Sequence, residues 1–385
     1  MDSDIKHPKP SNLYIGLMSG TSLDSIDAAL VSIEDEQCTL INSIEHPIPT
    51  VLRQQLISLC QPGNNEIDSM GEADSHLGQI FSEAVLALLK KSGNTPHDIV
   101  AIGSHGQTIR HRPSGTHAFT LQIGDPNTIA HLTQITTVAD FRRRDVAAGG
   151  QGAPLAPAFH RAFFGSKQHN RAIINIGGIA NITYLGSDGD YLAYDTGPGN
   201  TLLDAWISEI QELNYDHDGE WANTGTINSP LLNHLLSHPY FSQGLPKSTG
   251  REDFNLNWLK LSLENISLPP EDTQATLLEL TAQSIISAVN TLSNPVTEIY
   301  ICGGGAYNKA LMSRLRALVA TSDENKPDIQ ATKIGNTQEL GIAAEWVEAA
   351  AFAWLAKQTI EGKTGNLRRA TGASSEVILG AIYPV

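Results

Sequence analysis

The stretch LYIGLMSGTSLDSIDAALV at residues 13–31 decides how the rest of the chain is interpreted. It opens with an apolar run to Met18, breaks at a short turn rich in glycine and hydroxyl groups, and resumes as an alternating run to Val31. Two such runs around a polar turn predict a β-hairpin. An ordinary hairpin with a polar turn fits this stretch as well as a binding site does, so other parts of the chain must distinguish the two.

The turn of this hairpin has the chemistry of a phosphate-binding loop. Gly20 lacks a Cβ, so a ligand can approach the backbone closely, and consecutive N–H groups in a turn can form a nest for an anion. Thr21 and Ser22 add hydroxyl groups. Asp24 and Asp27 place carboxylates beside them, which suits a hydrated Mg²⁺ ion that bridges to phosphate oxygens.

Length and composition limit the class of protein. The 385 residues are enough for two domains or one large one, and 41% are hydrophobic. A net charge of −16 argues against a general nucleic-acid binder. No apolar run is long enough to cross a bilayer, and the polar residues 1–11 lack the apolar centre of a secretory signal. Three cysteines without metal-ligand spacing fit reduced cytosol, so we expect a cytoplasmic protein with neither membrane nor nucleic-acid partners.

The pattern of the opening hairpin returns about 160 residues later. An apolar strand at 172–176, the turn Gly177-Gly178 and a second strand at 179–185 repeat the strand, glycine turn and strand. This repetition suggests two α/β domains of similar design, each directing a phosphate-binding hairpin toward a shared cleft. A third glycine cluster, at 303–305, follows a strand at 298–302 and precedes a helix at 308–320, where a nucleotide could lie against bare backbone.

Periodicity predicts the elements between these clusters. We expect strands at 38–48, 99–102, 121–125 and 136–140, and helices at 67–91, 127–133, 153–164, 201–211, 273–292 and 337–356.

Two acidic residues are candidates for catalysis. Asp195 ends a strand in YDTGPGN, before a Gly-Pro-Gly bend and Asn200, a possible helix N-cap. It is a candidate general base, although an aspartate that only caps the turn is the alternative. Glu348 lies among alanines in the predicted last helix, where close packing would perturb its pKa, but it could equally lie on the solvated side.

Polar residues at another strand end suggest a second part of the site. His105 and Gln107 follow the strand at 99–102 between glycines, a common way to build a site in α/β proteins, although His105 could instead fix a loop. The arginines at 142–144 are either solvated surface or a clamp for an anionic substrate. Among them we choose Arg144, because strand alternation would send neighbouring side chains to opposite faces. The loop at 247–252, KSTGRE, might close over a ligand.

Nine segments taken together resemble the bacterial anhydro-N-acetylmuramic acid kinases. They occur in the family's order and span nearly all of residues 13–384: GLMSGTSLDSID, IGSHGQT, QIGDP, VADFRRRDVAAGGQGAPL, INIGGIANI, YDTGPGN, PKSTGRE, ICGGGAYN and EWVEAAAFAWLA. That family belongs to the sugar kinase, actin and heat-shock ATPase superfamily. The resemblance therefore implies an α/β protein with the two-domain actin-like ATPase (ribonuclease H-like) fold and a nucleotide cleft between the domains. We expect a tail at 1–12, a first domain at 13–140 onto which about 358–385 packs back, and a second domain at 141–357.

The resemblance also implies an activity. Members of the family use ATP and Mg²⁺ to open the 1,6-anhydro ring of anhydro-N-acetylmuramic acid with water and to phosphorylate O6, in cell-wall recycling. The resemblance also implies a homodimer. A related kinase acting on another small sugar, or a non-transferring ATPase of the same fold, are the alternatives.

Site residues follow from the resemblance and from the patterns above. By position, Asp195 matches the family's base and Glu348 the acidic residue that works beside it. The family's ATP phosphate loop matches Gly20, Thr21, Ser22, Leu23, Asp24, Ser25, Ile26 and Asp27, with Ser25 standing where glycine is common. We further expect the nucleotide at Gly177, Gly178, Gly197, Gly199, Asn200, Gly303, Gly304 and Gly305. The sugar is expected at His105, Gln107 and Arg144, and Mg²⁺ at Asp24 through water.

Overall fold

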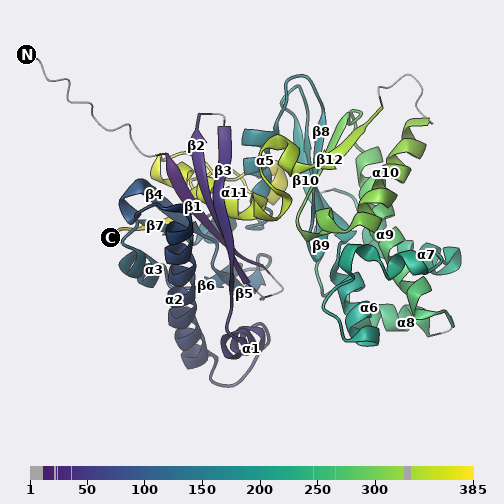
Figure 1. The fold of residues 1–385 in the computed structure, drawn as a ribbon, viewed down its shortest axis with the longest axis horizontal. Helices are drawn as coiled ribbons and strands as arrows, with labels where there is room; N and C mark the ends of the chain where they lie inside the picture. Colours follow the sequence, from purple (N-terminus) through teal and green to yellow (C-terminus); the bar gives the residue numbers. More distant parts are fainter. Residues whose placement is uncertain are drawn as a thin grey trace, which may run out of the picture. The chain divides into compact units, whose positions relative to one another are not determined.

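The structure is a computed structural model that describes residues 12–20, 23, 25–35, 37–245, 247–264, 266–324 and 331–385. The chain divides into two compact units. Unit 1 comprises Met1–Leu155, Glu348–Asn366 and Ala373–Val385, and unit 2 comprises Ala156–Val347 and Leu367–Gly372. Each unit is an α/β structure built on its own sheet (Figure 1).

The sheet of unit 1 has six strands in the order β13-β7-β4-β1-β2-β3. β1, β2 and β3 are an antiparallel meander, while β4 runs parallel to β1 and β7 parallel to β4. The strands are β1 (Leu13–Ser19), β2 (Ser25–Glu34), β3 (Gln37–Pro47), β4 (Ile99–Ser104), β7 (Thr137–Ala139) and β13 (Ala381–Tyr383). A separate two-stranded sheet pairs β5 (Gln107–Arg112) with β6 (Phe119–Ile123).

Helices cover both faces of this sheet. The helices of unit 1 are α1 (Thr50–Leu59), α2 (Glu66–Ser92), the 3₁₀ turn η1 (Pro96–Asp98), α3 (Pro126–Thr133), α4 (Phe141–Ala147) and α11 (Val347–Ile360). The long helix α2 lies along β2 and β3 (Figure 1) and shares one apolar core with Ile15 and Leu17 of β1. Burying one such side chain stabilises the fold by about 1.5–3 kcal/mol.

Helix α11 packs on the opposite face of the sheet, with its backbone close to the backbone of the strands. A Cβ on Gly16 of β1 would lie 1.7 Å from the carbonyl oxygen of Ala349, and one on Gly103 of β4 would lie 2.0 Å from that of Phe352. Alternate residues of a strand point to opposite faces, so Gly16 faces α11 while its neighbours face α2. These two glycines therefore let α11, and with it Glu348, lie directly on the sheet.

Unit 2 repeats the strand arrangement of unit 1. Its five strands have the order β10-β9-β8-β11-β12, with an antiparallel meander of three strands followed by two parallel ones. They are β8 (Arg171–Ile176), β9 (Ile179–Leu185), β10 (Tyr191–Pro198), β11 (Glu298–Cys302) and β12 (Lys333–Asn336). The order 3-2-1-4-5 thus occurs in both units. This confirms the predicted pair of hairpins and the ribonuclease H-like α/β fold class.

In unit 2, helices α6, α7 and α10 pack on α9, which is buried along most of its length, while α5 and α12 pack on strands of the sheet. The helices of this unit are α5 (Ala156–Phe164), α6 (Thr201–Gln211), α7 (Ser229–Leu236), α8 (Leu256–Leu263), α9 (Pro270–Asn290), α10 (Lys309–Glu324) and α12 (Arg368–Thr371). Short 3₁₀ turns join them: η2 (His217–Gly219), η3 (Ala222–Thr224), η4 (Pro239–Ser242), η5 (Gly304–Tyr307), η6 (Thr337–Leu340) and η7 (Ala344–Trp346).

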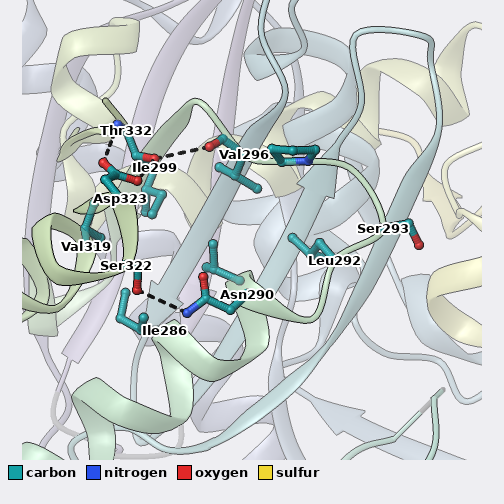
Figure 2. A pocket seen from close by; sticks show the side chains of 12 residues that line it. Ile286, Asn290, Leu292, Ser293, Val296, Ile299, Val319, Ser322, Asp323 and Thr332 are labelled. Atoms are coloured by element: carbon teal, nitrogen blue, oxygen red, sulfur yellow. Dashed lines mark hydrogen bonds between the residues drawn. The ribbon is translucent and has the colours of Figure 1, made fainter. Parts of the chain in front are cut away.

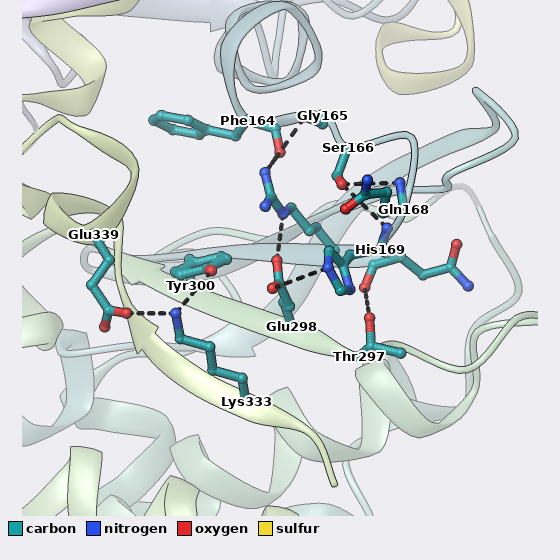
Figure 3. Close-up of polar contacts among 12 residues, drawn as sticks. Phe164, Gly165, Ser166, Gln168, His169, Thr297, Glu298, Tyr300, Lys333 and Glu339 are labelled. Atoms are coloured by element: carbon teal, nitrogen blue, oxygen red, sulfur yellow. Dashed lines mark hydrogen bonds and ion pairs between the residues drawn. The ribbon is translucent and has the colours of Figure 1, made fainter. Parts of the chain in front are cut away.

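An ionic and aromatic network joins the amino ends of β8, β11 and β12. Glu298 is the register partner of both Arg171 and Lys333, and Arg171 Nε donates to its carboxylate at 2.6 Å. The cations of Arg171 and Lys333 lie 5.6 and 5.3 Å from the centre of the Tyr300 ring. Figure 3 shows Glu298, Tyr300 and Lys333 on the neighbouring strands. These contacts link the amino ends of the three strands, at the opposite ends of the strands from the glycine turns.

The unit boundaries differ from those expected from the sequence. Residues 141–155 and 348–357 belong to unit 1, and 367–372 belong to unit 2. Asp145 of α4 accepts a hydrogen bond from Asn366 Nδ2 at 2.6 Å, which ties α4 to the C-terminal segment. The backbone contacts of α11 with Gly16 and Gly103 place that helix in unit 1. In α12, Arg369 lies 5.4 Å from the ring of Tyr191, which attaches this short helix to unit 2.

Two local predictions were wrong. The helix expected at 337–356 begins only at Val347, because Gly341 has φ +99° and ends a short 3₁₀ turn. The arginine segment continues as helix α4 rather than as a strand. The strand alternation that favoured Arg144 therefore does not apply.

Among the described residues, none of the helices is both long and apolar enough to span a membrane.

Candidate active site

Two of the glycine turns of unit 2 are hydrogen-bonded to each other at the carboxyl ends of β8 and β10. Gly199 N–H donates to Gly178 O at 2.9 Å, and Asn200 N–H donates to Gly177 O at 2.8 Å. Asn200 Nδ2 donates to Ile176 O at 3.3 Å, so its side chain does not cap α6 as predicted. The turns at 177–178 and 197–200 therefore form one surface.

The third cluster, at 303–305, joins this surface after β11. A Cβ on Gly303 would lie 2.4 Å from Asn175 Oδ1, and one on Gly305 would lie 2.4 Å from Ile176 Cγ2. A Cβ on Gly177 or Gly304 would meet nothing closer than 3.7 Å. The first pair of glycines is required for packing, whereas Gly177 and Gly304 leave open backbone that a ligand can approach.

Gly197 and Gly199 are also explained by packing. A Cβ on Gly199 would lie 2.4 Å from Gly177 O, and Gly197 has φ +148° with the Phe241 ring 2.8 Å from its Cβ position. The turn they form brings Asp195, two residues earlier, to the same end of the sheet.

Asp195 lies on β10 opposite Asn181, just before a register shift in the strand. Its carboxylate Oδ2 accepts a hydrogen bond from Thr249 N–H at 3.0 Å, and its carbonyl oxygen accepts one from the Tyr240 hydroxyl. Oδ1 receives no hydrogen bond from the part of the chain that the structure describes. The geometry thus holds the carboxylate while leaving one oxygen to accept a proton.

Burial brings the pKa of Asp195 into the range that suits a general base. Desolvation raises its pKa to about 6, the Thr249 N–H lowers this pKa, and the Glu252 carboxylate raises it. Asp195 is therefore ionised at neutral pH and holds a proton more readily than an exposed aspartate does.

In unit 1, polar side chains gather where β4 ends. Ser19 Oγ, at the end of β1, donates to Gln107 Oε1 at 2.6 Å, and both residues are buried. His105 N–H donates to Leu17 O at 3.0 Å, and the His105 ring lies 4.8 Å from that of Phe352 in α11. The structure thus brings together His105 and Gln107, the two residues predicted from this strand end.

Arg142, rather than Arg144, points into this cluster. Arg142 Nε donates to His105 Nε2 at 3.1 Å, and Arg142 Nη1 donates to Gly152 O at 2.7 Å. Burial and the guanidinium of Arg142 lower the pKa of His105 well below its ordinary value, so the imidazole is neutral and accepts this hydrogen bond. Arg144 is exposed on the outer side of α4. Arg143 forms an ion pair with Asp140 at 3.4 Å.

Glu348 lies in the first turn of α11, in the same unit as Arg142. Burial raises the pKa of Glu348, and the positive charge of Arg142 lowers it in part. Burial lowers the pKa of Arg142 to about 10, and Glu348 and Asp145 raise it, so Arg142 keeps its charge at neutral pH. The sequence drew attention to Glu348 through its alanine neighbours, but the arginine beside it was not identified.

The predicted phosphate loop is described only in part. Thr21, Ser22 and Asp24 lie outside the described residues, and so does the proposed contact of Asp24 with Mg²⁺. Leu23 N–H donates to Gly20 O at 3.3 Å. The side chains of Leu23 and Ile26 belong to the apolar core, so only their backbone can serve a ligand. Ser25 and Asp27 lie on β2 with partly exposed side chains.

A cavity of about 250 Å³ lies elsewhere in unit 2. Its lining includes Val296 and Ile299, near the amino end of β11 (Figure 2). Gly303 follows the carboxyl end of this strand, so the cavity lies at the other end. Both carboxylate oxygens of Asp323, which lines the cavity, accept hydrogen bonds from Thr332, one from its backbone N–H and one from its hydroxyl. None of the predicted site residues lines this cavity.

Comparison with known proteins identifies the family. The family model for anhydro-N-acetylmuramic acid kinase matches residues 12–385. The chain belongs to the anhydro-N-acetylmuramic acid kinase family. It is 53% identical to the anhydro-N-acetylmuramic acid kinase of Saccharophagus degradans, over 97% of this chain and 99% of that one. It is 52% identical to that of Coxiella burnetii, over 97% and 98%.

The resemblance to anhydro-N-acetylmuramic acid kinases that the motifs indicated is therefore confirmed. Among solved structures, the chain is similar to the activator of the 2-hydroxyisocaproyl-CoA dehydratase from Clostridium difficile with bound ADPNP. That match has 14% identity and a TM-score of 0.43 over 91% of this chain and 97% of that one, and a likeness this weak carries no inference here.

Two contacts of the site were missed from the sequence. Thr249, which binds Asp195, lies in PKSTGRE, a segment that was expected only to close over a ligand. Arg142 was set aside in favour of Arg144. The strand alternation used to choose Arg144 does not hold in helix α4, and the contacts that identify Arg142, with His105 and Gly152, join positions 37 and 10 residues apart.

Proposed function

We propose that this member of the family uses ATP to open 1,6-anhydro-N-acetylmuramic acid with water and to phosphorylate O6, giving N-acetylmuramic acid 6-phosphate in cell-wall recycling. The observation that carries the proposal is Asp195, a buried carboxylate with a pKa of about 6 at the glycine-turn end of its sheet. Family membership supports this substrate, and the burial of Asp195 beside the glycine turns supports its role as the base.

The substrate explains why a base is needed. A 1,6-anhydro sugar has no free hydroxyl at C1 or C6, so a kinase base has no proton to remove from O6. Asp195 instead takes a proton from water as its oxygen forms a bond to C1, in the manner of the base in an inverting glycosidase. The C1–O6 bond breaks, O6 forms a bond to the γ-phosphorus, and ADP leaves. The proton on Asp195 then returns to solvent, so one ATP and one water are consumed for each sugar.

The nucleotide phosphates are assigned to the open glycine backbone. At Gly177 and Gly304 the nearest atom to a Cβ would be 3.7 Å or more away, so these turns leave backbone that phosphate oxygens can approach. We assign the Gly20–Asp27 turn to the same role from its match to the family loop.

Mg²⁺ fits this arrangement as an ion held mainly by the phosphates. Within the described ranges there is no group of three or more His, Cys, Asp or Glu side chains that could hold a metal. Mg²⁺ keeps several waters and one or two carboxylates when it binds with a nucleotide, so Asp27, with Asp24, would suffice. When bound, it neutralises charge on the transferring phosphoryl group.

The muramic acid carboxylate is assigned to the cluster around Arg142. A guanidinium can hold a carboxylate with two hydrogen bonds. Arg142 is fixed by Gly152 and His105 and remains charged, while Arg144 is free of such constraints on the surface of α4. We retain Arg144 as the alternative that the sequence favoured.

Two further parts of the proposal come from the family resemblance and the composition. The protein is assigned to the cytoplasm, where its three cysteines stay reduced. It is proposed to be a homodimer, which light scattering coupled to size-exclusion chromatography would test.

Mass spectrometry tests the reaction. Incubation with ATP, Mg²⁺ and anhydro-N-acetylmuramic acid should give a product that has gained one phosphate and one water. Phosphorylation without gain of water would show a kinase of another sugar hydroxyl. ATP hydrolysis that does not depend on added sugar would favour the non-transferring ATPase.

A further inference from the structure

Backbone groups of the loop at residues 247–253 bind both the side chain and the backbone of Asp195. Thr249 N–H donates to Asp195 Oδ2 at 3.0 Å, and Asp195 N–H donates to Lys247 O at 3.4 Å. The Tyr240 hydroxyl, from η4 just before the loop, donates to the Asp195 carbonyl oxygen. One short segment of chain therefore fixes the position of the proposed base.

The loop is itself anchored at both ends. At its start, Lys247 Nζ donates to the carbonyl oxygens of Tyr240 and Phe241 at 3.2 and 3.4 Å, and lies 4.5 Å from the centre of the Tyr240 ring. Farther along, Thr249 Oγ1 donates to Asp253 Oδ2 at 2.7 Å. Thr249 is thus held through its hydroxyl while its N–H is directed at Asp195, so the donor is in place before any substrate binds.

Glu252 folds back over the same loop. The carboxylate of the exposed Glu252 lies close to Gly250, since a Cβ there would be 2.3 Å from Glu252 Oε2. The negative charge of Glu252 raises the pKa of Asp195, whereas the N–H of Thr249 lowers it. The loop therefore applies two opposing influences to a single carboxylate.

We infer that residues 247–253 are a positioning loop for the catalytic base, in which Asp253 holds Thr249 so that its N–H binds Oδ2 and leaves Oδ1 for the water proton. The inference rests on the proposed function, because it assumes that Asp195 is the base. Thr249, Glu252 and Asp253 act through Asp195 and need no contact with the sugar.

The pH dependence of kcat/KM tests the loop, since its acid limb reports the pKa of the base in the free enzyme. Glu252→Gln removes the charge that favours the protonated form, so the acid limb should move to lower pH. Thr249→Val removes the hydroxyl that binds Asp253 but keeps the shape, so the N–H is held less well and the limb should move to higher pH. Thr249→Ser restores the hydroxyl and should return the limb to its wild-type position. Glu264→Gln, a change of the same charge in an exposed residue after α8, is the control and should leave the limb unchanged.

A general loss of structure cannot move the acid limb in opposite directions in Glu252→Gln and Thr249→Val. Unshifted limbs in both variants, or shifts of the same sign, would overturn the positioning loop. Asp195→Asn is measured alongside: if it is inactive while the loop variants show no shift, only the loop inference fails. If Asp195→Asn turns over the anhydro sugar like the wild type, the proposed function fails instead.

Discussion

Asp195 in unit 2 and Glu348 in unit 1 are both partly buried carboxylates with raised pKa values, yet the charges around them have opposite signs. Asp195 has the negative Glu252 nearby, which raises its pKa further. Glu348 has the positive Arg142 nearby, which opposes the effect of burial. Burial raises the pKa of both residues, and the sign of the neighbouring charge is one feature that separates them.

The difference in charge suggests a difference in role. A general base must bind a proton during the reaction, and a negative neighbour favours that step while a positive one disfavours it. Asp195 is therefore suited to accept the proton from water. Glu348, whose raised pKa is lowered in part by the positive charge of Arg142, is suited to orient Arg142 or the water.

Replacing Asp195 with asparagine should give the largest effect. Asp195→Asn keeps the size of the side chain but cannot accept a proton, and loss of a general base commonly costs about 10²–10⁴-fold in rate. Ring opening and phosphorylation should fall together in kcat, while calorimetry should show that ATP and the sugar still bind. Glu264→Gln, in an exposed residue after α8, is the control and should keep wild-type kcat.

Replacing Arg142 should have the next largest effect, on sugar binding rather than on kcat. Removing one partner of a buried charge pair typically costs about 2–5 kcal/mol. Arg142→Ala should therefore raise the KM for the sugar far more than that for ATP, and Arg142→Lys should recover only part because it lacks the planar fork. Arg144→Ala is the matched control. A large rise in sugar KM for Arg144→Ala alone would restore the assignment made from the sequence.

Replacing Glu348 with glutamine should have the smallest effect of the three. Because the role proposed for Glu348 is to orient rather than to accept the proton, we expect a loss of kcat below about 10²-fold. Steady-state kinetics of Glu348→Gln beside Asp195→Asn measure the ratio directly. A larger loss in Glu348→Gln than in Asp195→Asn would exchange the two roles.

Much of the fold could be predicted because the sequence signals were local. The glycine turn between the apolar runs around Gly20 and the one at Gly177 gave the two hairpins, and the apolar run at 298–302 gave β11 with the same bounds as in the structure. The helix boundary at Val347 was missed because Gly341 ends the preceding turn within a pattern that otherwise looks helical.

The site was predicted less completely because its contacts join distant parts of the chain. Asp195 could be found from its own neighbours, but its partner Thr249 lies 54 positions away. The choice among the arginines depended on whether the segment is a strand or a helix, which its charges do not reveal. Likewise, periodicity did not distinguish the glycines that pack, such as Gly199, from those that leave open backbone, such as Gly304.

The most direct test of the two roles is the pH dependence of kcat/KM for the wild type, Asp195→Asn and Glu348→Gln. The raised pKa means that Asp195 is protonated, and unable to act as a base, below about pH 6. The wild-type kcat/KM should therefore fall about tenfold for each pH unit below this point. The account predicts that Glu348→Gln keeps this acid limb and that the residual activity of Asp195→Asn lacks it. An acid limb that persists in Asp195→Asn, or one that disappears in Glu348→Gln, would contradict the assignment of Asp195 as the base.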